Sequence, residues 1–389
     1  MSYILSNDNR FYVQTEQSYG SAATVAGTNR IPAVSLSIKQ QTEKVQRKDK
    51  TGSRTFVGNP SGLRPNTSFG LKSYMTSWAD QTTLPAHGPL FQACLGGQAT
   101  IAGAGTVAGM PTSTQIAFTT PHGLSPGRAV TSGGELRFVS AVVDDLTIQL
   151  QAPFTTPPAT SSTTGPTAVY QPAEALNSVT IFDYWSPGTA VQRILPGAAL
   201  DKLTLNVNGD FHEFEFSGQA QDVLDSASFQ SGESGLTAFP AEPTLGSFNY
   251  SIIPGHLGQV WLGTLPNRFF TLTKAQVSFQ NNIDLRAEEF GAILPLAIAP
   301  GQRTVTLDFS LYQVDDVPTQ SLYQAARQKS PISVMIQLGQ QQGQLFGVYM
   351  KSVIPQVPQF EDTETRQQWQ FQSSRAQGSV NDEIFVAFG

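Results

Sequence analysis

The sequence predicts a mainly β fold, with two tandem β-sandwich or barrel domains, each with a short flanking helix, and a small inserted β-module. Short segments with alternating apolar and polar residues recur along the 389 residues. Only 13% of the residues are charged, and 34 Gly with 25 Pro supply frequent turns between these segments. The same order of segments occurs twice, which indicates two related domains.

The first predicted domain comprises residues 1–97 and 173–225. In "AVSLSIK" the residues Val34, Leu36 and Ile38 alternate with polar residues, as in a half-buried strand. A long loop leads to a second strand, "TSFGLKSYM", and then to a short helix, "GPLFQACLGG", which ends at a glycine pair. The strands "NSVTIFDYW", "DKLTLNVN" and "FHEFEFSG" complete the domain.

Residues 98–172 interrupt this domain and differ in composition, because they are rich in Thr, Ala, Gly and Pro. Their interior predicts strands at "TQIAFTT", "RAVTS", "ELRFVSAVV" and "LTIQLQA", separated by turn signals. The flanks "GGQATIAGAGTVAG" and "TTPPATSSTTGPT" have the composition of flexible linkers. We therefore expect a small β-module that hangs outside the main fold and that assembly does not require.

After bridging loops at 226–268, residues 269–389 repeat the first domain. "TKAQVSFQN" corresponds to "AVSLSIK", and "RTVTLDFSLY" corresponds to "TSFGLKSYM". A helix with Thr319 as its predicted N-cap follows, and its "LYQA" matches the "LFQA" of the first helix. In the strands that follow, Trp369 and Phe371 match Phe214 and Phe216.

No catalytic, metal or cofactor site is predicted. The four histidines are far apart, and the acidic pairs fall at turns, where solvent contact is the simplest explanation. The triplet Lys50-Thr51-Gly52 lacks the Ser-x-x-Lys of serine acylases and precedes a strand rather than a phosphate-binding helix. The single cysteine, Cys94, excludes an intrachain disulfide. We expect no enzyme, no cofactor and no metal.

The loop after the first strand holds the main charge cluster of the chain. This loop is a weak candidate for a nucleic-acid site, because its charges lie in one loop without interleaved aromatic residues. The first alternative is a solvated loop with no binding role. The second is an arm that docks on another copy of the chain. The corresponding loop of the second domain is acidic, so loops of opposite sign favour head-to-tail contact between copies. The predicted inter-subunit or inter-ring contact residues are Lys44, Arg47, Lys48, Lys50, Arg54 and Phe56 in the first loop, and Asp284, Glu288, Glu289 and Phe290 in the second.

The order of these segments resembles the major tail tube proteins of long-tailed bacteriophages. The features that carry the resemblance are "AVSLSIK" with its long charged loop, "SFGLKSYM", "PLFQACLGG", "AQVSFQNNIDL", "PGQRTVTLDFSLY" and the terminal strand. The resemblance covers both domains but excludes the insert. It implies a structural virion protein whose domains close rings by pairing their sheets, with stacked rings forming the conduit for DNA and the long loop making contacts between rings.

A chain with two such domains is expected to form a trimeric ring with pseudo-sixfold symmetry, with a hexamer as the alternative. Its partners are then further copies of itself and other tail proteins, in a virion tail assembled in the host cytoplasm without a membrane anchor. DNA is expected to pass without tight binding, because the net charge is −6. Two alternatives stay open: a tail-tip component or a protein that caps or initiates the tube, and a carbohydrate-binding β-protein of the tail, marked by a cleft lined by aromatics and carboxylates.

Overall fold

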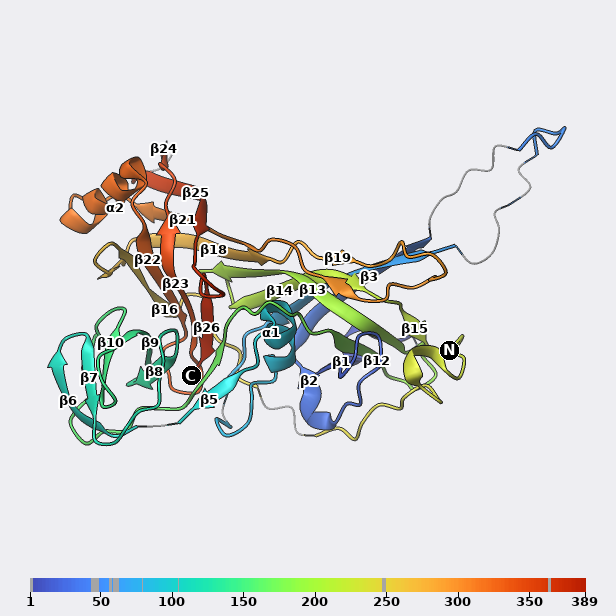
Figure 1. The fold of residues 1–389 in the computed structure, drawn as a ribbon, viewed down its shortest axis with the longest axis horizontal. Coiled ribbons are helices and arrows are strands. Elements are labelled where there is room, and N and C mark those ends of the chain that lie inside the picture. Colours follow the sequence, from blue (N-terminus) through green and yellow to red (C-terminus); the bar gives the residue numbers. More distant parts are fainter. Residues whose placement is uncertain are drawn as a thin grey trace.

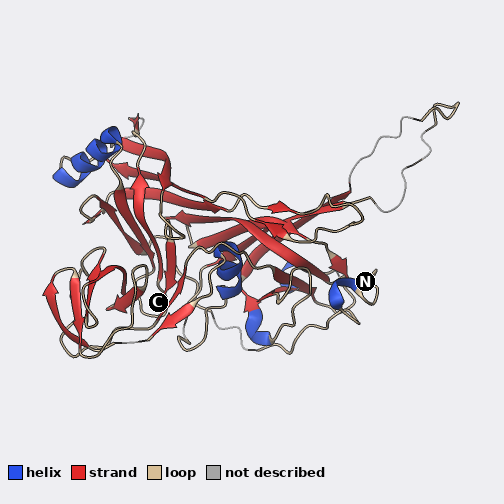
Figure 2. Ribbon diagram, in the orientation of Figure 1, coloured by secondary structure: helices blue, strands red, loops and turns tan. Residues whose placement is uncertain are grey.

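The computed structural model describes residues 3–42, 49–55, 58, 63–78, 80–103, 105–246, 250–362 and 365–389. Within these residues the protein is mainly β, as predicted, with curled sheets and two α-helices (Figure 2). The helices are α1 (Gly88–Leu95) and α2 (Val317–Gln328), and short 3-10 turns occur at Ser6–Asp8, Gly27–Asn29 and Glu233–Gly235.

The strands of the first half curl around α1. They are β1 (Asn9–Thr15), β2 (Arg30–Ile31), β3 (Ala33–Thr42), β4 (Pro65–Tyr74), β12 (Val179–Trp185), β13 (Arg193–Val207), β14 (Glu213–Ala220) and β15 (Leu224–Asp225). The predicted alternation holds in β4, where Thr67, Phe69, Leu71 and Ser73 are buried and the residues between them are not. The helix α1 begins next to Pro89 and ends at Gly96, whose φ of 88° suits glycine.

The second half repeats this arrangement with strands from residue 258 onward. They are β16 (Gly258–Gly263), β17 (Asn267–Arg268), β18 (Leu272–Gln280), β21 (Thr304–Tyr312), β22 (Ile332–Leu338), β23 (Phe346–Ile354), β24 (Gln359–Glu361), β25 (Gln368–Ala376) and β26 (Phe385–Phe388). β16 and β17 lie inside the stretch expected to be bridging loops, and β16 pairs with β22. The N-cap of α2 is Asp316, whose carboxylate accepts a hydrogen bond from the backbone N–H of Thr319 at 2.8 Å. The prediction of Thr319 as the N-cap was therefore wrong.

Strand pairing follows the same order in both halves. In the first half the order is β2, β1, β12, β13, β14, β4 and β3. In the second half it is β17, β16, β22, β23 with β24, β25, β21 and β18. The halves also share a register shift at the start of β3 and of β18.

One cross-strand row fixes which residues are equivalent. Ser35, Lys72, Glu215 and Thr204 lie opposite one another across the first half. Lys274, Ser310, Gln370 and Gln359 form the same row in the second half. Counting along the strands from this row pairs Phe214 with Trp369 and Phe216 with Phe371, which confirms those two matches. It also shows that β23 and β24 together correspond to the single long strand β13.

The two halves join through one continuous sheet, because β13 pairs antiparallel with β18. Leu203 lies opposite Phe279 and Leu205 opposite Val277, and all four side chains are buried. The shared core runs across this junction and includes Phe91 of α1. Figure 1 shows the sheet extending along the length of the molecule, with the N-terminus near one end.

The insert folds as a separate sheet of five strands, four of them predicted. They are β6 (Val107–Thr112), β7 (Gln115–Phe118), β8 (Ala129–Ser132), β9 (Glu135–Val142) and β10 (Thr147–Leu150), paired in the order β6, β7, β10, β9, β8. The expectation of flexible linkers was wrong. The first flank contains β5 (Thr100–Ala102) and the start of β6, and β11 (Thr167–Tyr170) begins at the last residue of the second flank; β5 and β11 pair with each other, and β11 also pairs with β26.

The insert is docked on the second half through a buried interface, beside the C-terminal strands in Figure 1. Phe138 stacks on Tyr349, and Trp261 and Met335 belong to the same buried cluster. The Arg137 side chain is fully buried, forms an ion pair with Glu135 and lies over the Trp261 ring. A module that hangs loosely outside the fold would bury neither the aromatic cluster nor this cation.

Candidate assembly surfaces

The first long loop is described only in part. Four of its predicted contact residues, Lys44, Arg47, Lys48 and Phe56, lie outside the described residues. Lys50 and Arg54 lie in the segment 49–55, where every residue is exposed. In Figure 1 this segment is the small blue piece that stands well away from the body.

The second long loop, between β18 and β21, lies on the first half of the same chain. At its start the Asn281 side-chain amide donates to the carbonyl oxygens of Cys94 at 2.7 Å and of Leu200 at 3.1 Å. The backbone N–H of Ile283 donates to the Asp201 carboxylate at 2.8 Å. A short hairpin of β19 (Asp284–Leu285) and β20 (Ile298–Ala299) then carries the loop outward.

The middle of this loop is held by two further side chains of the first half. The Arg64 guanidinium donates to the carbonyl oxygens of Glu289 at 2.8 Å and Ala292 at 3.1 Å. The Gln221 amide donates to the carbonyl oxygen of Pro295 at 2.9 Å. Every one of these bonds ends on the loop backbone, so they fix its path without depending on its side chains.

The predicted acidic residues of the second loop point to solvent or to a local partner. Asp284 and Glu288 are exposed, and Glu289 forms an ion pair with Arg286 of the same loop. Phe290 is 106% exposed. Within the described chain the structure does not bring these residues to Lys50 or Arg54, so contact between the two loops of different copies stays a prediction.

The continuous sheet has an open end at β3. This strand pairs with β4, and within the described chain no other strand lies on its far side. Its equivalent, β18, is covered on that side by β13, and the difference is visible in burial. Ala275 and Val277 are 5% and 2% exposed, whereas their equivalents Leu36 and Ile38 are only half-buried.

A second open edge is β24, the counterpart of the part of β13 that faces β18. Phe360 of β24 is 51% exposed, whereas its equivalent Leu205 is 2% exposed. The Phe360 ring touches Tyr323 and Trp369 on its inner side. The sequence contains a signal for this edge, because Pro355 and Pro358 bracket the break between β23 and β24 and proline in sheets is confined to edges and bulges.

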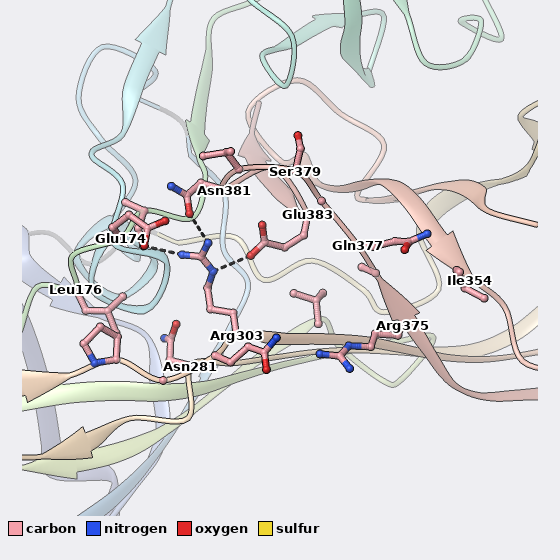
Figure 3. Close-up of a pocket in the computed structure, with 18 of the residues that line it drawn as sticks. Glu174, Leu176, Asn281, Arg303, Ile354, Arg375, Gln377, Ser379, Asn381 and Glu383 are labelled. Carbon is pink, nitrogen blue, oxygen red and sulfur yellow. Dashed lines mark hydrogen bonds and ion pairs between the residues drawn. The ribbon is translucent and has the colours of Figure 1, made fainter.

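A pocket of about 820 Å³ opens on the second half, next to β23 and β25 (Figure 3). At the centre of its polar wall, the Arg303 guanidinium donates hydrogen bonds to the Glu383 carboxylate and to the Ala173 carbonyl oxygen, at 2.7 Å each. It also donates a hydrogen bond to the Asn381 side chain. Three exposed glutamines, Gln302, Gln356 and Gln377, also line it. Its described lining holds no aromatic residue.

A second pocket of about 820 Å³ contains Trp78, Tyr250 and Asp80. Trp78 is 5% exposed and its indole N–H donates to the Thr83 carbonyl oxygen at 2.7 Å. The buried Trp78 ring offers no open platform for a sugar, so the half-buried Tyr250 and the exposed Asp80 are the aromatic and carboxylate groups that this pocket presents, and the carbohydrate-binding alternative stays a hypothesis.

The buried polar groups support structure rather than an open reaction centre. His87 lies 3.0 Å from the Ser73 hydroxyl, but both residues are buried and no open pocket described above includes them. Burial lowers the pKa of His87 to about 4, so its ring is neutral at pH 7. In the described residues no group of three His, Cys, Asp or Glu side chains is placed to hold a metal ion.

No helix in the described part of the chain is long and apolar enough to cross a membrane. No protein-family model matches the chain, and no curated protein sequence matches it.

Proposed function

We propose that this chain is a structural virion protein that assembles into closed, stacked rings, the tail tube of a long-tailed bacteriophage. The observation that carries the proposal is the junction between the halves. There, an edge of the first half pairs with β18 of the second half to make one uninterrupted sheet. The same two kinds of edge, β24 and β3, are left open at the ends of the chain's sheet.

A second copy supplies the edge that each end lacks. By equivalence with the pairs Leu205–Val277 and Thr204–Ser278, Phe360 of one copy is placed opposite Ile38 of the next, and Gln359 opposite Lys39. The half-buried Ile38 and half-exposed Phe360 side chains then cover each other. Such an interface joins two different surfaces, so it propagates head to tail and closes into a ring when the rotation permits.

Ring closure covers the open edges of β3 and β24, which are hazardous in a monomer. Three chains with two repeats each give six repeats, hence the proposed trimer with pseudo-sixfold symmetry. The net charge of −6 suits a conduit that does not hold DNA, because tight phosphate contacts need clustered cations.

Negative-stain electron microscopy of the purified protein, with mass photometry across a concentration series, tests the proposal. We expect rings that stack into tubes as concentration rises. Single rings that never stack would favour the alternative of a component that caps or initiates the tube. Monomers at every concentration would refute self-assembly.

A further inference from the structure

The pocket of Figure 3 occupies the position at which the first half holds the second long loop. Counting from the matched rows of the two halves, Gln302, Gln356 and Gln377 are the equivalents of Arg64, Asp201 and Gln221. Those three residues of the first half make the hydrogen bonds to Ile283, Glu289, Ala292 and Pro295 described above. On the second half their three equivalents line an open pocket instead.

The first long loop has the length needed to fill this pocket. The stretch from Thr42 to Arg64 is one residue longer than the equivalent stretch from Asn281 to Gln302. Its described segment 49–55 corresponds in position to the part of the second loop around Glu289 and Ala292. That segment stands away from the body of its own chain, whereas the second loop lies on the body (Figure 1).

The chemistry of the pocket suits the backbone of such a segment. All four hydrogen bonds made by the three anchors on the first half end on backbone N–H or C=O groups of the loop. A glutamine amide both donates and accepts, so the three glutamines can bind either backbone group. Because only backbone groups are bound, a basic loop and an acidic loop of unrelated sequence can occupy equivalent binding positions on the two halves.

We propose that the pocket lined by Gln302, Gln356 and Gln377 docks the segment 49–55 of a second copy. The contact is lateral, within one ring, because its equivalent spans the side-by-side junction of the two halves. This inference rests on the proposed ring, and it assigns the first loop to the contact within rings rather than to the contact between them.

Engineered cysteines test the docking, since the native Cys94 is fully buried. The test variant combines Thr55→Cys with Gln377→Cys, treated with a short thiol-reactive cross-linker. The matched control combines Thr55→Cys with Gln221→Cys, because the position next to Gln221 is already occupied by the second long loop of the same chain. We expect most chains of the test variant to join to other chains, with covalent products that stop at the number of chains in one ring, and only background joining in the control.

The other outcomes contradict the inference in different ways. Covalent ladders longer than one ring would place the segment across the stack, and cross-links confined to single chains would place it on its own body. Rings seen by microscopy without cross-links would overturn the docking alone. Protein that stays monomeric would overturn the docking and the proposed ring together.

Discussion

Replacing Phe360 with aspartate should prevent ring formation while leaving the folded chain intact. Phe360 lies on the last strand of the sheet and is 51% exposed, so an aspartate there stays in contact with water in the monomer. In the proposed ring the same side chain faces Ile38 of the next copy. A carboxylate at that place loses the apolar contact and must also be desolvated beside a half-apolar strand.

The size of the effect follows from the exposed area of the ring. A phenylalanine side chain buries about 150–250 Å² when fully covered, so the exposed half corresponds to ~100 Å². At about 25 cal/mol per Å² this contributes ~2.5 kcal/mol to each junction. That loss raises the dissociation constant of each junction roughly 60-fold, and the desolvation of the carboxylate adds to it.

Mass photometry measures the concentration at which rings form, and thermal unfolding reports whether the monomer is intact. The matched control is Leu265→Asp, which places the same charge at a residue 78% exposed in the turn between β16 and β17, outside β3 and β24. We expect rings from the control at wild-type concentrations and monomers from Phe360→Asp. Rings from both variants at the same concentration would show that β24 is not at the interface.

Two further predictions concern stability. Arg137→Ala leaves the buried Glu135 carboxylate without its cation, so the free energy of unfolding in urea should fall by about 3–5 kcal/mol, and an unchanged midpoint would contradict the buried interface of the insert. The pKa of His87 is lowered to about 4 in the folded protein, so as the pH falls the unfolded chain binds a proton at His87 before the folded chain does. The neutral buried ring therefore contributes fully to the free energy of unfolding above pH 6.5, and this contribution is lost as the pH falls towards 4. His87→Gln should remove up to about 3 kcal/mol of that pH dependence, and urea midpoints of the two proteins that change in parallel between pH 7 and pH 4 would contradict it.

Alternation predicted the strands that have one face in the core, and β12, which is covered on both faces, was predicted as well, but β16 and β6 were missed. β4 and β18 alternate as expected, whereas β16, "GQVWLG", has three consecutive buried residues and no alternation. β6, "VAGMPT", contains the Gly and Pro that made its stretch resemble a linker. These segments form strands because tertiary pairing supplies the partners that local sequence does not specify.

The inter-subunit contacts of the two long loops stay a prediction, but the structure shows what holds the second loop in place. Apart from the Asn281 side chain at its start, the hydrogen bonds that hold the second loop on the first half end on the loop backbone, which carries no side-chain signal. Arg64, Asp201 and Gln221, the residues that hold it, were not predicted because nothing in their own segments marks them as anchors. These three anchoring residues became identifiable only when the strand pairing showed which residues of the two halves are equivalent.

The open edges of β3 and β24 are complementary to each other and poorly matched to themselves. β24 has only three residues and follows Pro358, so two copies of it offer few backbone groups to each other. β3 has ten residues and carries polar side chains over its last four positions, Lys39 to Thr42, so pairing with itself would bring these polar ends against the half-buried Leu36 and Ile38. Pairing of β24 with β3 instead repeats a register that the chain already uses at its internal junction. The internal repeat therefore favours head-to-tail association, the kind of association that builds a ring.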